Sequence, residues 1–337
     1  MNVDLAMLEA LFKEGLRRTL AEDEADDVKS WARRKLDEMG GGDETSLLTW
    51  QESFDFTDKM LADFAARAAL PADQRQVLDW PWWTWNQNID AAEGGMLGVI
   101  TAPDGMGKTI YAECIAEHWA QRRNRVVYVH YELNKSWMMQ RRLARHARVP
   151  VRDIRHNELT PDQRNAIAVV RPRLLEWQGM IHYEHTPGWT MERTIAELTK
   201  LRTEGMCDVV VIDYLEKVAP SPRQIKLHME WYQREADNVE QLKNFAEAAE
   251  MPVLMVAQMR KDSKSKDMAQ LDRGSMRGAG EKSEKANLVV LLNRKREDVG
   301  YSNEVNVLVD KNTMGPSGAT FSQWMQPEYF DVRDIAQ

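Results

Sequence analysis

Two glycines, a lysine and a threonine stand close together in residues 102–109, which read Ala-Pro-Asp-Gly-Met-Gly-Lys-Thr. The stretch follows a short apolar run at 96–100 and precedes a helical pattern at 110–120, the strand–loop–helix setting of a P-loop. Gly105 and Gly107 allow the backbone to curl around an anion where a Cβ atom would clash. We therefore predict a nucleoside triphosphate site built from Ala102, Pro103, Asp104, Gly105, Met106, Gly107, Lys108 and Thr109.

The side chains at the end of this loop have separate expected roles. Lys108 can reach the β and γ phosphates, and the hydroxyl of Thr109 can bind Mg²⁺. The backbone N–H groups of the loop and the N-terminus of the following helix would face the anion. The expected ligand is therefore a nucleoside triphosphate with Mg²⁺.

A second motif lies at 208–213, where Asp-Val-Val-Val-Ile-Asp is typical of a buried strand that ends in a carboxylate. Ligands of parallel α/β sheets bind beyond the carboxyl ends of the strands, so Asp213 would lie beside the P-loop. Its carboxylate would hold Mg²⁺ directly or through water. Downstream of a P-loop, this pattern is typical of a Walker B strand.

Two further polar residues also follow expected strands. Glu132 comes after the strand at 126–130 and is the best candidate to polarise the attacking water. The alternative is a surface glutamate that caps a helix, as Asn134 and Ser136 are also capping residues. Gln258 ends the strand at 253–258, where a glutamine is otherwise a solvated loop residue, so a role at the γ phosphate rests on the family resemblance given below.

Basic residues gather in a polar stretch after Gln258 that has no hydrophobic period. Its functional interpretation is a loop that tracks the phosphates of single-stranded nucleic acid, and its alternative is a solvated connection. A shorter loop at 220–227 follows the Walker B strand and is expected to share that role. The candidate DNA-binding residues are Arg223, Lys226, Arg260, Lys261, Lys264, Lys266, Arg273 and Arg277.

Composition limits the class of protein. The chain has 337 residues, a formal net charge of −8 and 43% hydrophobic residues, which argues against a uniformly basic nucleic-acid binder but allows a local basic surface. Its two cysteines form no disulfide framework or zinc motif. The start of the chain has no signal-peptide pattern, and no apolar run reaches the length of a membrane span. We expect a soluble, cytoplasmic protein.

Strand and helix patterns alternate after the P-loop, which predicts an α/β fold with a mostly parallel, helix-covered sheet. Expected strands lie at 126–130, 180–184, 209–213, 253–258, 288–293 and 305–309, and expected helices at 136–147, 191–203 and 233–249. Residues 1–75 are expected to be a helical N-terminal region with a glycine hinge at 40–42. The tryptophans at 80, 82, 83 and 85 are expected to pack on the core rather than to stack on a base.

From about residue 80 to the end, the chain resembles the ATPase domain of DnaB-type replicative helicases, which have the RecA fold and form rings. The motifs occur in the family's order over about three-quarters of the chain. Besides the P-loop they are Thr84 and Asp90 with residues 94–98, Tyr131-Glu132-Leu133 with Arg141, residues 185–190, Ile212-Asp213-Tyr214-Leu215, residues 252–258, residues 276–280 with Arg294, and residues 310–318.

The resemblance implies ATP as the nucleotide, Mg²⁺ as the metal and a RecA-like domain at 76–337. It also implies a hexameric ring that encircles one DNA strand, moves 5′ to 3′ and meets a primase or loader. Arg141 would bind nucleotide, Gln258 would sense the γ phosphate, and Lys311 would reach into the neighbouring subunit's site.

The chain departs from the family's pattern at two places. The family has a Lys-x-Arg pair near the C-terminus, but here Lys311 is followed by Thr313 where the arginine is expected. An arginine finger is worth roughly 10³–10⁵ in rate, so either Arg294 or Arg296 substitutes or hydrolysis is weak. Residues 1–75 do not resemble the family's N-terminal domain. Two alternatives therefore stay open: a non-unwinding, RecA-like or loader-like ATP switch that binds single strands, and a structural subunit of an active ring.

Overall fold

The protein is described here from a computed structural model, which describes residues 78–259, 284–298 and 300–335 and a few helical positions between 58 and 65. The chain divides into two compact units, Met1–Leu70 and Pro71–Gln337. The strands and helices named below belong to the second unit. Apart from those few positions, the expected helices and hinge of the N-terminal region lie outside the described residues.

The described strands form one sheet with the order β3-β2-β4-β5-β1-β6-β7-β8-β9. Neighbours from β3 to β6 run parallel, and those from β6 to β9 run antiparallel. The predicted mostly parallel α/β sheet is thus confirmed. The strands are β1 (Leu97–Ala102), β2 (Val126–His130), β3 (Ile181–His185), β4 (Val209–Asp213), β5 (Val253–Gln258), β6 (Leu288–Arg296), β7 (Tyr301–Asn312), β8 (Thr320–Gln326) and β9 (Asp331–Asp334).

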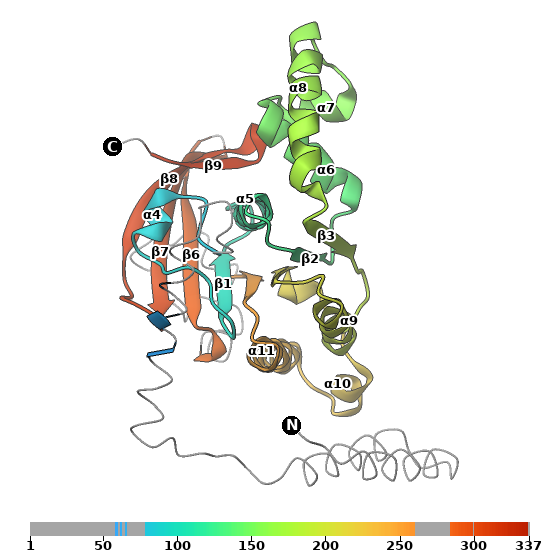
Figure 1. Ribbon diagram of the computed structural model, residues 1–337, viewed down its shortest axis with the longest axis vertical. Coiled ribbons are helices and arrows are strands. Elements are labelled where there is room, and N and C mark those ends of the chain that lie inside the picture. The colour runs from blue at the N-terminus through green and yellow to red at the C-terminus, as the bar shows by residue number, and fades with distance from the viewer. Residues whose placement is uncertain are drawn as a thin grey trace, which may run out of the picture. The chain divides into compact units, whose positions relative to one another are not determined.

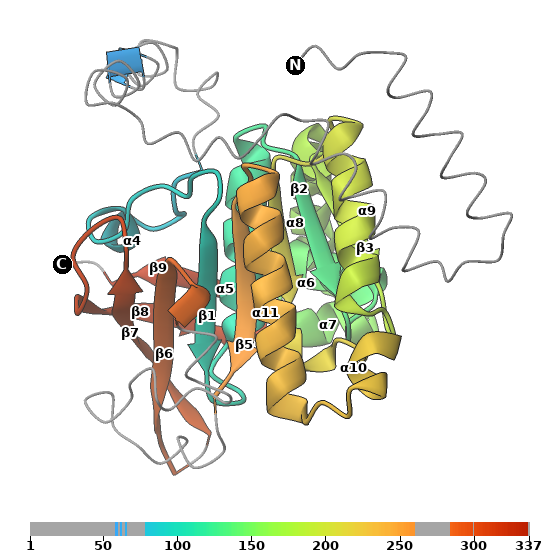
Figure 2. The same cartoon turned by 90° about the horizontal axis from the view of Figure 1, so that it is seen from below.

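Helices cover both faces of the parallel part of the sheet (Figures 1 and 2). Alternate strand residues point to opposite faces, so Ile100 and Tyr128 join one core cluster while Val99 and Val127 join the other. The first cluster includes α5 (Lys108–Gln121), α6 (Lys135–Ala147) and α8 (Pro161–Gln178), and the second includes α9 (Met191–Thr203) and α11 (Trp231–Ala248). Shorter helices are α4 (Trp83–Asn86), α7 (Val151–His156) and α10 (Pro222–Lys226), with 3₁₀ turns η2 (Leu215–Lys217) and η6 (Pro327–Tyr329).

Most expected elements are confirmed, but α4, α7, α8, β8 and β9 were not expected, and the segment expected as a loop at 220–227 forms the short helix α10 instead. Helix α8 begins at a capping box on Thr160 and contains Pro172. Most of its side chains are exposed or half-buried, so its sequence has no clear apolar stripe. In β8, which lies between β7 and β9, hydrophobic and polar residues mix without strict alternation, and most of its side chains are only partly buried. Within the described residues, no helix is long and apolar enough to cross a membrane.

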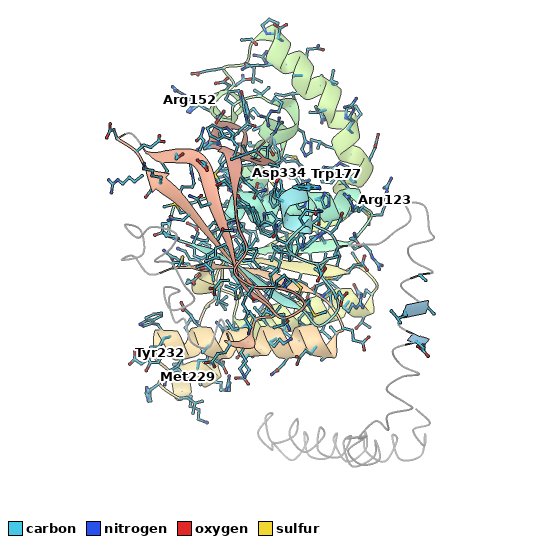
Figure 3. The ribbon with its side chains drawn as sticks, turned by 90° about the vertical axis from the view of Figure 1, so that its left-hand side faces the viewer. Arg123, Arg152, Trp177, Met229, Tyr232 and Asp334 are labelled. Carbon is cyan, nitrogen blue, oxygen red and sulfur yellow. The ribbon has the colours of Figure 1, made fainter. Side chains whose placement is uncertain are left out.

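The predicted packing of the tryptophans is confirmed for three of them and is wrong for Trp83, which is 60% exposed. Trp80, Trp82 and Trp85 are buried, and the ring centres of Trp82 and Trp85 lie 5.2 Å apart. Their indole N–H groups donate to the Asp90 carbonyl, the Val332 carbonyl and the Gln323 side chain. The carboxylate of Asp334 on β9, which is labelled in Figure 3, holds the C-terminal strand against α4. It accepts the backbone N–H of Trp83 at 2.8 Å.

Candidate nucleotide site

The predicted P-loop joins β1 to α5 at the carboxyl end of the parallel strands. Gly105 and Gly107 have φ angles of +82° and +97°, the left-handed region that favours glycine. A Cβ atom on Gly107 would also overlap the side chain of Met325 from β8. Strand β8 therefore packs against the loop through Met325, and the positive φ of residue 107 favours glycine there.

A cavity of about 320 Å³ opens in front of this loop. It gathers residues from stretches that lie far apart in the sequence, including most of the predicted nucleotide residues, and we call it the nucleotide cavity. It is lined by Asp104, Gly105, Gly107, Lys108, Thr109, Ile110, Glu132, Arg141, Asp213, Tyr214, Gln258 and Phe330. Of the other predicted loop residues, Ala102, Pro103 and Met106 are buried behind it.

Lys108 lies across the mouth of the loop. Its Nζ donates to the carbonyl oxygens of Ala102 at 2.9 Å and Pro103 at 3.2 Å. These bonds are made within the loop and are of the kind that a bound phosphate would replace with a stronger, charge-assisted partner.

Asp213 is fully buried, and its two carboxylate oxygens have different partners. One accepts the hydroxyl of Thr109 at 3.3 Å, and the other accepts the hydroxyl of Tyr128 at 2.9 Å. Burial alone would raise the pKa of Asp213, but hydrogen bonds from His130, Tyr128 and Thr109 hold that pKa below its ordinary value. The group is therefore a carboxylate at neutral pH. Two adjoining oxygen ligands, Thr109 and Asp213, fit the preference of Mg²⁺.

Glu132 lies on the loop between β2 and α6 and is exposed toward the cavity. It does not cap α6, because Asn134 is the N-cap and accepts the backbone N–H of Trp137 at 3.0 Å. The helix-capping alternative is therefore wrong. The hydroxyl of Tyr214 hydrogen-bonds the Glu132 carboxylate, and burial together with this negative charge raises the pKa of Tyr214.

Gln258 lies at the end of β5, directly beside Ala102 at the end of β1. Its side-chain amide donates to the carboxylate of Asp104 in the P-loop, and its backbone N–H donates to Glu216 at 2.9 Å. The predicted sensor residue is thus in contact with the loop that would hold the phosphates.

Sequence reasoning missed Phe330. This residue follows η6, has a φ of +52°, and lines the nucleotide cavity below the guanidinium of Arg141. Its carbonyl accepts the Nε of Arg145 at 2.7 Å. No local motif marks Phe330, because its position depends on β9 returning to α5 and α6.

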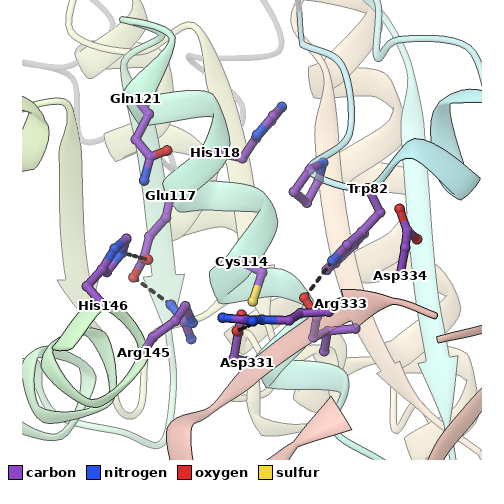
Figure 4. Close-up of a pocket in the computed structure, with 12 residues that line it drawn as sticks. Trp82, Cys114, Glu117, His118, Gln121, Arg145, His146, Asp331, Arg333 and Asp334 are labelled. Carbon is purple, nitrogen blue, oxygen red and sulfur yellow. Dashed lines mark hydrogen bonds and ion pairs between the residues drawn. The ribbon is translucent and has the colours of Figure 1, made fainter. Parts of the chain in front are cut away.

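A second cavity of about 340 Å³ lies between α5, α6 and β9 (Figure 4). On its wall the buried carboxylate of Glu117 pairs with Arg142, Arg145 and His146 at 2.7–3.1 Å. Burial raises the pKa of the nearby Cys114 thiol to about 12, so this thiol is protonated and unreactive at neutral pH. The cavity holds an ion cluster that fastens α5 to α6.

Lys311 and Arg294 lie outside the nucleotide cavity. Lys311 on β7 pairs with Val289, near the amino end of β1, and its Nζ donates to the Glu284 carbonyl. It therefore lies at the opposite end of the sheet from its own P-loop. Arg294 is 7% exposed, and its guanidinium donates to the carbonyls of Ser302 at 2.6 Å and Gly105 at 3.4 Å. In the isolated chain these bonds hold the guanidinium of Arg294 beside the P-loop, and a finger role for Arg294 or Arg296 stays a prediction.

The DNA-binding candidates are described only in part. Arg223 and Lys226 are exposed on α10, and the Arg223 guanidinium pairs with the carboxylate of Asp237 on α11. That pair raises the pKa of Arg223. The remaining candidates lie outside the described residues: Arg260, Lys261, Lys264, Lys266, Arg273 and Arg277.

The fold and this cavity define a class of protein. A P-loop on β1, an acidic residue on β4 and a strand between them that ends in glutamine are the parts of a RecA-like P-loop ATPase domain. A sequence model of the family described as DnaB-like helicase C terminal domain matches residues 84–330, and the chain belongs to that family.

Individual relatives are distant in sequence. Replicative DNA helicase DnaB of Geobacillus stearothermophilus is 24% identical over 225 residues, or 65% of this chain and 48% of the relative. Replicative DNA helicase DnaC of Bacillus subtilis (strain 168) is 21% identical over the same shares. The chain thus spans about half the length of these curated relatives.

Two solved structures share the fold. The ATPase domain of G40P matches 72% of this chain and 85% of its own with a TM-score of 0.63 and 18% identity. A DnaB-like replicative helicase, solved to describe its interactions with primase, matches 97% of this chain and 75% of its own with a TM-score of 0.72 and 15% identity.

Proposed function

We propose that this chain is the motor of a ring-forming replicative DNA helicase that hydrolyses ATP to move along single-stranded DNA, 5′ to 3′. The observation that carries the proposal is the nucleotide cavity, where Lys108, Asp213, Glu132 and Gln258 converge on a P-loop. Membership of the family supports ATP as the nucleotide.

In this proposal each side chain has a role that follows from its contacts. The N–H groups of the P-loop and the Nζ of Lys108 bind the phosphates, and Lys108 gives up its bonds to Ala102 and Pro103 to do so. Thr109 and Asp213 hold Mg²⁺, which neutralises phosphate charge when bound. Arg141 and Phe330 enclose the base.

Hydrolysis needs a base and a sensor. Glu132 accepts a proton from the attacking water, and Tyr214 orients its carboxylate. While the γ phosphate is bound, the side-chain amide of Gln258 donates to it instead of to Asp104. After the phosphate leaves, the amide donates to Asp104 again. Because basic residues 260–277 follow Gln258 directly, this exchange would be transmitted to the strand-binding loop.

The ring is supported by Lys311, which lies far from its own P-loop and is suited to a neighbour's site. We propose a homo-hexamer on this basis. Arg223, Lys226 and the residues of the 260–277 loop would bind the phosphates of one strand in its channel. A primase is proposed as a partner because a helicase of this fold was solved for its primase interactions, and a loader is the other candidate.

The second candidate function is an ATP switch that binds single strands without unwinding, and Thr313 favours it. Thr313 is exposed and stands where the arginine is expected, and its hydroxyl offers a neighbouring subunit no positive charge. Strand displacement by the purified chain on a duplex with a 5′ tail separates the two functions. We expect ATP-dependent displacement that needs the 5′ tail. Hydrolysis and strand binding without displacement would favour the switch.

A further inference from the structure

His130, the last residue of β2, lies directly opposite Asp213 of β4 in the parallel register. Residues paired in this way project to the same face of a sheet, here the face covered by α5. The backbone is fixed on both sides, because His130 O accepts the N–H of Thr186 at 3.0 Å and Asp213 O accepts the N–H of Tyr131 at 3.1 Å. The imidazole is 3% exposed, so strand pairing and burial determine its position.

The two ring nitrogens of His130 point to different parts of the site. Nδ1 accepts the backbone N–H groups of Glu132 at 3.0 Å and Leu133 at 2.9 Å. A ring nitrogen that accepts carries no proton, so the neutral ring has its proton on Nε2. Nε2 lies 3.2 Å from Oδ2 of Asp213. One buried ring therefore connects the Walker B carboxylate with the peptide groups of Glu132.

We propose that His130 is a positioning residue for hydrolysis, which fixes the loop of Glu132 at a set distance from Asp213. The inference rests on the proposed role of Glu132 as the base. A general base must lie within hydrogen-bond reach of the water proton, and a glutamate on an exposed loop reaches many positions. Two hydrogen bonds from the loop backbone to the buried ring of His130 restrict the positions of the Glu132 backbone. The hydroxyl of Tyr214 restricts the position of the Glu132 carboxylate.

Two substitutions separate the contact of His130 with the Glu132 loop from its contact with Asp213. In His130→Asn, the amide oxygen lies near the position of Nδ1 and accepts from the loop, but the side chain is too short to reach Asp213. In His130→Gln, the amide nitrogen lies near the position of Nε2 and donates to Asp213, but no acceptor remains for the loop. If positioning of Glu132 is the role of His130, asparagine rescues hydrolysis and glutamine does not.

The measurement is single-turnover ATP hydrolysis by the full chain with Mg²⁺, beside calorimetric affinity for a non-hydrolysable ATP analogue. Because general-base catalysis contributes about 10²–10⁴-fold, we expect His130→Gln to slow hydrolysis by about tenfold or more and His130→Asn to retain most of the rate. Affinity should change by less than about twofold in both. Wild-type hydrolysis by His130→Gln, or equal losses of rate and affinity, would overturn the proposal.

The double variant His130→Gln/Glu132→Gln identifies the route of the effect. Since His130 acts through Glu132, this variant should be no slower than Glu132→Gln alone, and multiplied losses would overturn the proposal. If Glu132→Gln hydrolyses ATP slowly and His130→Gln hydrolyses it at the wild-type rate, only the positioning role of His130 is rejected. If Glu132→Gln itself keeps the wild-type rate, Glu132 is not the base, and the positioning role is rejected with it. His182→Gln, on the adjacent strand β3, is the matched control and should keep the wild-type rate.

Discussion

The guanidinium of Arg141 lies 4.4 Å from the centre of the Phe330 ring, although α6 and the turn after η6 are far apart in sequence. Both residues line the nucleotide cavity, and Arg141 is held from its other side by Glu113 at 2.8 Å. The C-terminal segment is tied to α6 through Arg145 and to α4 through Asp334. It therefore contributes Phe330 to the wall of the nucleotide cavity.

Phe330→Ala should weaken binding of an ATP analogue by about tenfold, because stacking on one base is worth about 1–3 kcal/mol. Calorimetry with inorganic tripolyphosphate provides the comparison, and its affinity should not change because it has no base. The adjacent Tyr329→Ala is the matched control, since the Tyr329 ring lies under Arg148 and outside the cavity. Equal losses for ATP analogue and tripolyphosphate would exclude a base-binding role.

Glu117→Gln should destabilise the fold by several kcal/mol at neutral pH, because Arg142 and Arg145 lose their buried partner. The burial of Glu117 opposes ionisation, but Arg145, His146 and Arg142 hold its pKa well below the usual range. A depressed pKa stabilises the fold above the unfolded pKa of about 4.3, and this contribution is lost as the pH falls below it.

Denaturant unfolding of wild type and Glu117→Gln at pH 7 and about pH 3, which is well below the unfolded pKa, tests this sign. The difference in unfolding free energy between wild type and Glu117→Gln should be smaller at the lower pH. Glu197→Gln removes a glutamate from the exposed pair with Lys200 and should cost less than about 1 kcal/mol. If the difference between wild type and Glu117→Gln stays constant or grows as the pH falls, the assigned role of Glu117 in the ion cluster is contradicted.

Neutralising Lys264, Lys266 and Arg273 together should weaken single-strand binding and lower its salt dependence. Each lost phosphate contact reduces the slope of log K against log salt by about 0.7, so the three together should reduce it by about 2. Binding of oligothymidine over a range of salt concentrations measures the slope. The same number of charges removed elsewhere, at Arg171, Arg173 and Lys200, should leave it unchanged. If the loop variant keeps the wild-type slope, the loop is a solvated connection.

Thr313→Arg should raise ATP turnover in the assembled ring, since a guanidinium at this position would meet the neighbour's γ phosphate. Thr320→Arg adds the same charge to exposed β8 and should have no effect. Turnover per subunit should rise with protein concentration until assembly saturates. Turnover that stays constant on dilution to monomers would contradict a site shared between subunits.

The sequence predicted the parallel half of the sheet closely, for a physical reason. Strands β2, β4 and β5 are buried on both faces, so each is a continuous apolar run with definite ends, and all three were expected with their observed bounds. Catalytic candidates followed from these ends, because a polar residue there faces the ligand. Glu132, Asp213 and Gln258 do line one cavity.

The parts that could not be predicted depend on long-range contacts. Phe330 enters the cavity only because β9 pairs with β8 and returns to α5 and α6. His130 reads as one more residue of a strand, and its link to Asp213 appears only with the pairing of β2 and β4. The contacts of Arg294 also depend on the turn between β6 and β7, which directs its guanidinium to carbonyls of its own chain.

The most direct test of the account is single-turnover ATP hydrolysis by Glu132→Gln, with nucleotide affinity measured in parallel. The account predicts hydrolysis slowed by about 10²-fold or more, as expected for loss of a general base. Affinity for ATP with Mg²⁺ should be retained, because Lys108, Thr109 and Asp213 are unchanged. Wild-type hydrolysis by Glu132→Gln would contradict the account and remove Glu132 from the mechanism.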